Sequence, residues 1–349
     1  MTIILFIIVL AILILSHELG HFLVAKISGI RVDEFAFGFP PRLFSFKKGE
    51  TRYSFNALPL GGYVKIHGEE GDEENDPRSF ASKKIYIRAA VIFAGVFFNL
   101  VLAWILLSGT FMLGMPTSVE DFPEGTVKDA YVTVIEVQKG TPAEKAGLRV
   151  GDQLLDFNTT KDLQKFINEN KGKEINLKYK RGKEANSILI TPSENPEQDK
   201  GALGIAMDKI GLLKLPWHKS IWEGLKRTVG LTALVAKLIY EFIADAFGGE
   251  PIIDKISGPV GIFKATGNFA TLGFTYILGF IALFSINLAV INILPFPALD
   301  GGRILFLLIE LIKGSPVNHR FSNMVHTIGL VLLLVLLAFI TYHDILKFI

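Results

Sequence analysis

Four long apolar stretches constrain the fold of this chain more than any other feature of its sequence. They lie at residues 2–24, 85–113, 272–294 and 325–342, and half of all residues in the chain are hydrophobic. About 20 mostly apolar residues are enough for a helix to cross a lipid bilayer. No Lys or Arg precedes the first stretch, so we expect a retained span rather than a signal peptide. The sequence therefore predicts a polytopic α-helical membrane protein with four transmembrane helices.

A fifth helical segment, residues 216–248, is amphipathic. Its charged side chains recur on one side of a helix, at Glu223, Lys226, Arg227, Lys237, Glu241 and Asp245. This pattern is typical of a helix that lies on a surface rather than one that spans a bilayer. The surface can belong to the membrane or to a neighbouring soluble domain, and the sequence leaves both open.

Charge and cysteine content narrow the classes of function. The chain has 36 Lys and Arg against 34 Asp and Glu, so no overall field favours nucleic acid as a partner. It has no cysteine, which excludes disulfides, Cys-ligated metal centres and thiol catalysis. Eleven Lys and Arg lie in residues 25–88, and this excess predicts a cytoplasmic loop over residues 25–84. The segment between the second and third spans then lies outside the cytoplasm.

An HExxH motif, His17-Glu18-Leu19-Gly20-His21, lies at the end of the first apolar stretch. Positions i and i+4 of a helix share one face, so both imidazoles can bind a single Zn²⁺ while Glu18 reaches the water on that metal. Ionisable groups are costly to place in an apolar helix and usually mark function there. The motif therefore predicts a metal-dependent hydrolase inside the membrane.

A catalytic zinc site needs a third protein ligand, and Asp300 is the candidate. It follows the third apolar stretch in the run from Asn292 through Pro295 and Pro297 to Asp300-Gly301-Gly302. The two prolines stop the helix, and the two glycines allow a tight turn. The predicted topology places Asp300 at the same membrane boundary as the HExxH motif. As an alternative, Asp300 caps the helix that follows.

The pair of motifs HExxH and NxxPxPxLDG resembles the signature of the site-2 protease family of intramembrane zinc metalloproteases. The resemblance covers nearly the whole chain and is greatest to bacterial members that regulate the sigma-E pathway. It includes Gly61-Gly62-Tyr63-Val64-Lys65, residues 257–262 and the run Leu299-Asp300-Gly301-Gly302. The best-known enterobacterial member carries two PDZ domains in tandem, whereas this chain has room for one.

The resemblance implies the roles of the site residues. His17, His21 and Asp300 would hold Zn²⁺, and Glu18 would be the general base. Asn292 would bind the substrate backbone. Asn99, in the second span, can serve either the site or helix packing.

The resemblance also implies a membrane-associated β-element in the first loop. Residues 52–66 predict a hairpin, with strand-like runs on both sides of Pro59 and the glycine pair. An edge strand at Gly61, Gly62, Tyr63 and Val64 could capture an unwound substrate by strand addition. A plain hairpin packed on the inner face is the alternative. The acidic run at residues 69–76 predicts a solvated loop.

Residues 119–209 predict one extracytoplasmic PDZ domain of the α+β class. The run from Gly140 to Leu154 resembles the PDZ signature, with a short helix after Pro142 and a strand from about Gln153. Strand-like residues 175–179 and 188–191 follow, and residues 202–205 fit the loop that binds a peptide carboxylate. PDZ domains bind extended C-termini by adding a strand. A size filter that binds no peptide is equally compatible with the sequence.

Together these features predict an intramembrane zinc endopeptidase in the bacterial cytoplasmic (inner) membrane. By resemblance, its substrates are single-span membrane proteins, such as anti-sigma factors and remnant signal peptides, cut after a first protease has acted. One alternative is a proteolytically inactive membrane scaffold that presents the PDZ domain, but such a scaffold has no reason to retain buried ionisable groups. Another is a metal transporter, for which the second and fourth spans offer little beyond Asn99, His326 and Thr327.

Overall fold

The computed structural model describes residues 2–69, 75–123, 125–182, 184–196, 201–249 and 258–348. Ser257 and residues 70–74 of the acidic run lie outside this part of the chain. The chain forms two compact units. Unit 1 consists of Met1–Gly109, Ile221–Phe269 and Ile277–Ile349, and unit 2 of Thr110–Ser220 and Ala270–Tyr276.

Four helices of the described chain are long and apolar enough to cross a membrane. They are α1 (Thr2–Ile27), α2 (Ile85–Leu113), α7 (Phe274–Asn292) and the segment Arg320–Leu346 of α9 (His319–Phe348). The expectation of four helices that are able to span a membrane is confirmed. α2 has the predicted bounds, whereas α9 extends beyond residues 325–342 at both ends, because its flanking polar residues are compatible with a continuing helix.

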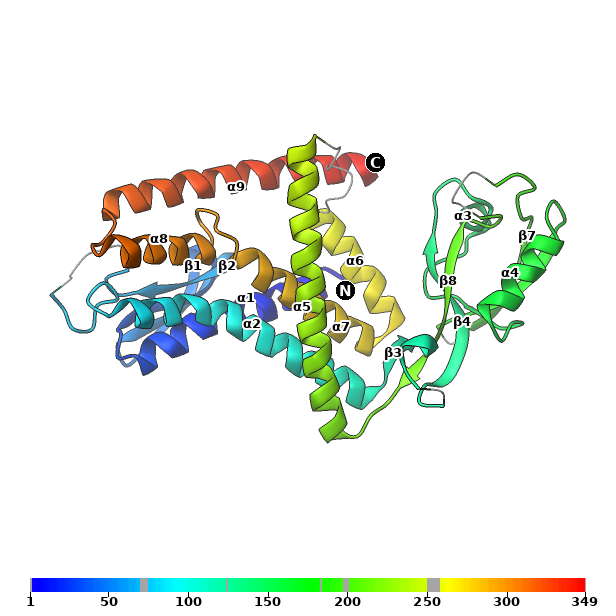
Figure 1. Ribbon diagram of the computed structural model, residues 1–349, viewed down its shortest axis with the longest axis horizontal. Coiled ribbons are helices and arrows are strands. Elements are labelled where there is room, and N and C mark those ends of the chain that lie inside the picture. Colours follow the sequence, from blue (N-terminus) through cyan, green and yellow to red (C-terminus); the bar gives the residue numbers. More distant parts are fainter. Residues whose placement is uncertain are drawn as a thin grey trace. The chain divides into compact units, whose positions relative to one another are not determined.

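Three further helices belong mainly to unit 1: α5 (Trp217–Gly248), α6 (Pro259–Leu272) and α8 (Asp300–Lys313). α5 is the amphipathic segment, and it crosses α2 and α7 (Figure 1). Its Val235 is buried with Ala103 of α2 and Ile286 of α7. Gly224 allows the close crossing, since a Cβ there would lie 2.2 Å from Ser108 Oγ. α5 thus packs on α2 and α7 at Gly224 and Val235, whereas other apolar residues of this helix, such as Val229 and Leu238, are exposed.

The first loop folds into a two-stranded sheet of β1 (Val32–Lys48) and β2 (Thr51–Ile66), beside α1 (Figure 1). The prediction of a hairpin within residues 52–66 is wrong, because those residues form a single strand. The hairpin turn lies at Gly49, whose φ of 64° suits a tight turn between the paired residues Lys48 and Thr51.

The register of this sheet is unusual. Phe35 pairs with both Tyr53 and Val64, and Tyr53 also pairs with Phe46. The first half of β1 is therefore flanked by the beginning of β2 on one side and by its end on the other. The end of β2, residues 62–66, has β1 as its partner on one side in the described pairings, and so it forms an edge of the sheet.

Unit 2 contains a six-stranded sheet in the order β3-β8-β4-β5-β6-β7, with two short helices, α3 and α4 (Figure 1). The elements are β3 (Met115–Ser118), β4 (Lys128–Val137), α3 (Pro142–Ala146), β5 (Gln153–Leu154), α4 (Thr160–Glu169), β6 (Ile175–Arg181), β7 (Glu184–Ile190) and β8 (Ile205–Leu213), with a 3₁₀ turn at Val119–Asp121. Leu154, Leu163 and Leu177 lie in its core. Asp152 is fully buried and receives two hydrogen bonds of 2.7 Å from Arg181, so its charge is compensated.

Candidate metal centre

His17 and His21 lie one turn apart on α1, as their spacing predicts. Their Nε2 atoms are 3.2 Å apart, and both side chains are buried. α2 passes directly over the two rings at Gly95. A Cβ on Gly95 would lie 2.3 Å from His21 Nε2 and 2.7 Å from His17 Cε1. A small residue is therefore required on α2 for both imidazoles to fit between the helices.

The loop between α7 and α8 brings Asp300 to the imidazoles. α7 ends at Asn292, and the prolines that follow keep the chain out of the helix. Gly301 and Gly302 lie in the first turn of α8, and a Cβ on Gly301 would be 2.2 Å from the Ile293 carbonyl oxygen. The glycines thus allow the loop to fold back onto the helix. Leu299 is the N-cap of α8, and Asp300 is the first helical residue. The alternative in which Asp300 caps this helix is therefore wrong.

The three candidate ligands meet at one point. Asp300 Oδ2 is 3.1 Å from His17 Nε2 and 3.4 Å from His21 Nε2. Donors bound at zinc distances with tetrahedral angles are separated by about 3.3 Å. Asp300 Oδ2 is also buried, and no hydrogen bond to it is found in the described part of the chain. This donor set therefore fits a tetrahedral zinc ion with a fourth position open.

The charge of Asp300 suits a metal ligand. Burial by itself would raise the pKa of its carboxyl, but the two neighbouring imidazoles outweigh burial and hold that pKa well below its usual range. The carboxylate is therefore ionised at neutral pH and can bind a cation without first losing a proton.

Outer contacts orient both imidazoles. His21 Nδ1 lies 2.9 Å from the Val91 carbonyl oxygen, to which it donates, and this leaves its Nε2 as the metal-facing atom. His17 Nδ1 lies 3.3 Å from the Asn99 amide nitrogen, and the buried Oδ1 of that amide has no hydrogen-bond partner among the described residues. Because the two ends of an amide are assigned rather than observed, turning this amide would let His17 Nδ1 donate to Oδ1. Of the two roles considered for Asn99, the structure thus favours support of the site.

A cavity of about 370 Å³ opens beside the three ligands. Glu18 and Asn292 line it, together with the predicted substrate-binding residues Gly61, Gly62, Tyr63 and Val64 at the edge of β2. The edge strand approaches α1 closely, since a Cβ on Gly62 would lie 3.3 Å from Glu18 Cγ. The structure therefore places the predicted ligands, Glu18, Asn292 and the predicted edge strand around one cavity.

Two contacts of the site had no counterpart in the sequence analysis: the Val91 carbonyl and the space at Gly95. Every residue has a backbone carbonyl, so the residue type at position 91 does not indicate this contact. A glycine in an apolar helix does signal a close approach of another helix, but it does not say which one.

We expect Gly95→Ala to weaken zinc binding by about 10- to 100-fold, as losing an outer support of a metal ligand does. The added methyl group would displace one or both imidazoles. Metal content and a chelator competition measure the effect. Gly109→Ala, on the same helix, is the control, since no atom of the described residues lies within 4 Å of a Cβ there. Equal zinc affinity in the two variants would contradict this account of Gly95.

Comparison with known proteins gives consistent matches. The profile of Peptidase family M50 matches residues 5–336. A Clostridium perfringens protein provisionally named a zinc metalloprotease is 36% identical over 339 residues, which is 95% of both chains. The Bacillus subtilis protein named regulator of sigma-W protease RasP is 30% identical over 99% of this chain and 98% of its own. The Geobacillus kaustophilus zinc metalloprotease RasP is also 30% identical, with the same coverage.

Proposed function

This chain is a zinc metalloprotease of peptidase family M50, the site-2 protease family, and we propose that it cleaves single-span membrane proteins within the membrane. One observation carries the proposal. The donors of His17, His21 and Asp300 lie within 4.8 Å of one another, and the two histidines are part of a helix apolar enough to span a bilayer.

In the proposed mechanism, His17, His21 and Asp300 hold the ion. Zinc bound by these residues would act as a Lewis acid that activates water and polarises the scissile carbonyl. Glu18 accepts a proton from the attacking water and delivers it to the leaving amine. Asn292 lines the same cavity and donates its amide N–H to the substrate backbone. Burial of the site keeps these interactions strong, because little water competes for them.

The substrate is proposed to bind as an added strand. Peptide bonds in a transmembrane helix are occupied by hydrogen bonds within that helix, so cleavage requires local unwinding. The edge of β2 at Gly61, Gly62, Tyr63 and Val64 lines the cavity beside Glu18. Pairing with this edge would replace the hydrogen bonds that the substrate loses on unwinding.

A cross-linking experiment tests strand addition. The chain has no cysteine, so Tyr63→Cys introduces a single thiol at the edge. We expect it to form a disulfide with a cysteine placed near the scissile bond of a single-span substrate. Lys47→Cys is the control. Lys47 lies in the second half of β1, where it pairs with Arg52, and this part of the sheet is away from the edge formed by the end of β2. Equal cross-linking from both positions would argue against an ordered strand at Tyr63.

We further propose the finer organisation of the protein. Unit 2 serves as a PDZ domain on the extracytoplasmic side and either binds a peptide or limits substrate size. The zinc site works near the cytoplasmic side of a bacterial inner membrane. A relative is named for regulation of sigma-W, which supports an anti-sigma factor as a substrate; remnant signal peptides are a second class. Cleavage by a first protease would precede the action of this enzyme.

The decisive test uses the purified chain in detergent with a model single-span substrate. We expect about one zinc per chain, as three protein ligands imply, and cleavage within the apolar segment. Zinc without cleavage of any single-span substrate would favour the inactive scaffold. Absence of zinc would overturn the ligand assignment.

A further inference from the structure

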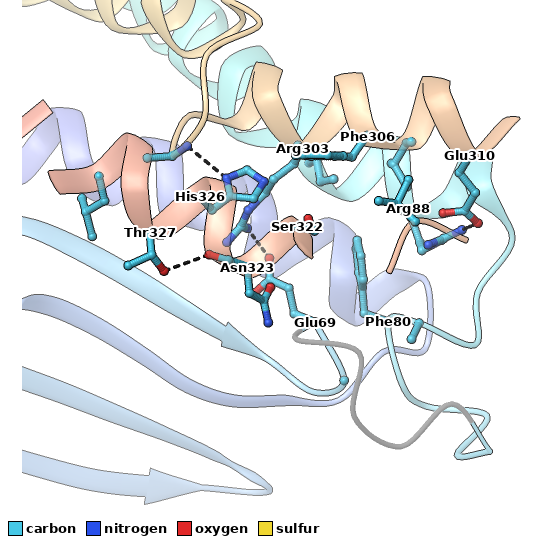
Figure 2. A pocket seen from close by; sticks show the side chains of 17 residues that line it. Glu69, Phe80, Arg88, Arg303, Phe306, Glu310, Ser322, Asn323, His326 and Thr327 are labelled. Carbon is cyan, nitrogen blue, oxygen red and sulfur yellow. Dashed lines mark hydrogen bonds and ion pairs between the residues drawn. The ribbon is translucent and has the colours of Figure 1, made fainter. Parts of the chain in front are cut away.

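A second cavity, of about 590 Å³, adjoins the site on the α8 and α9 side. It shares Glu69, Ile92, Ala298 and Arg303 with the first cavity. Figure 2 shows that its labelled side chains come from α8, α9, the start of α2 and the segment before it. Glu69 and Arg303 form one ion pair in this cavity, and Arg88 and Glu310 form another. Their charges are thus already matched, and the imidazole of His326 is the remaining titratable side chain among those labelled in Figure 2.

His326 turns inward from a helix whose apolar segment is mostly exposed. Only 6% of the apolar window of α9 is buried, yet His326 reaches the loop that precedes Asp300. Its Nδ1 accepts a hydrogen bond of 3.0 Å from the Ala298 backbone N–H (Figure 2). Its ring packs on Phe306 of α8, with ring centroids 5.4 Å apart. An imidazole on a spanning helix is costly unless it serves a purpose, and the proposed chemistry does not use this one.

The partner of His326 is a strained position in the chain. Ala298 has a φ of 75°, and in the described residues only Asp129 is another non-glycine with a positive φ. An alanine rarely adopts this left-handed conformation unless its surroundings hold it there. α9 supplies those surroundings twice. A Cβ on Gly329 would lie 2.6 Å from the Pro297 carbonyl oxygen, and Gly329 shares a helix face with His326.

We propose that His326 is a positioning residue for Asp300. Its Nδ1 holds Ala298 in the left-handed conformation, and from that conformation the chain continues through Leu299 so that the Asp300 carboxylate turns toward His17 and His21. His326 touches neither the reacting atoms nor the ion, so its effect passes through the loop alone. This inference rests on the proposed zinc site, because it assigns a support to one of the ligands of that site.

Two substitutions separate the hydrogen bond from the ring packing. His326→Asn retains an acceptor, since Oδ1 is attached to Cγ as Nδ1 is in histidine, but it removes the ring from Phe306. His326→Phe retains the ring and removes the acceptor. Thr327→Ala is the control on the same helix, because the Thr327 hydroxyl bonds to the Asn323 carbonyl of α9 itself.

The test measures zinc affinity of the full-length chain in detergent by competition with a chelator, together with thermal unfolding. We expect His326→Phe to weaken zinc binding by about 10- to 100-fold, as loss of an outer support does. His326→Asn is expected to restore most of that affinity, and Thr327→Ala to match the wild type. If all three variants unfold at temperatures close to that of the wild type, the loss of zinc affinity reflects a change at the zinc site and not a general loss of stability.

Two results would overturn the proposal. One is wild-type zinc affinity in His326→Phe. The other is an equal loss in His326→Asn and His326→Phe, which would show that an acceptor at the Nδ1 position does not by itself hold the loop. A wild-type protein without zinc would instead overturn the proposed function, and this outcome is distinct because it is visible before any substitution is made.

Discussion

Glu18→Gln is expected to lower kcat by about 10²- to 10⁴-fold, the range that a positioned general base contributes. The amide is close in size to the carboxylate, so the cavity beside Gly62 keeps its shape. It cannot accept the proton of the attacking water. Zinc content should stay at the wild-type level, because Glu18 is not part of the ligand cluster of His17, His21 and Asp300.

The measurement pairs single-span substrate cleavage with metal analysis of the same preparations. Glu241→Gln is a matched control, since Glu241 is an exposed residue of α5 paired with Lys237, and it should leave both readings unchanged. If Glu18→Gln retained wild-type turnover, another group would have to serve as the base. If it lost zinc as well, Glu18 would have to be counted among the residues that hold the ion.

Asp300→Asn is expected to weaken zinc binding by more than about 100-fold. Loss of a residue that only supports a ligand costs about 10- to 100-fold, and Asp300 is itself a proposed ligand. The substitution keeps the shape of the side chain and removes the charge that draws the ion to this buried point. Two imidazoles then remain, which is one protein ligand fewer than a catalytic zinc site has. Cleavage should fall together with zinc occupancy.

Added zinc distinguishes this variant from Glu18→Gln. Because the defect of Asp300→Asn is in occupancy, cleavage should recover in part as zinc is raised, whereas Glu18→Gln should not respond. Asp156→Asn, at an exposed carboxylate of unit 2 that pairs with Lys178, controls for the loss of one negative charge. Tight zinc binding by Asp300→Asn would remove Asp300 from the ligand set.

The sequence was sufficient for those parts of the protein that depend on neighbouring residues. The bounds of α2 follow from an uninterrupted apolar run, because a backbone in lipid must satisfy its own hydrogen bonds as a helix. The joint orientation of His17 and His21 follows from the pitch of the helix. In both cases the controlling distance along the chain is short, so local pattern determines the outcome.

The local sequence pattern gave the wrong hairpin turn in the first loop, because two glycine-containing segments both resemble a turn. The glycines at 61 and 62 after Pro59 resemble a hairpin turn, yet β2 continues through them. The turn forms instead at Gly49, and the end of β2 pairs with β1. Pairing between strands depends on residues that are far apart in the sequence, so the sequence of one strand alone does not identify its partner.

Only the tertiary structure decided how the site is supported. Asp300 was proposed as a ligand from a motif, but its distances to His17 and His21 depend on how a loop, α8 and α1 pack together. Gly95 approaches the two imidazoles, and His326 contacts the loop before Asp300, through packing between helices far apart in the sequence. Helix geometry is set within a few residues, whereas the position of one helix on another is set by the fit of whole surfaces. The sequence therefore indicated the candidate groups for holding the metal, and packing determined that these groups meet.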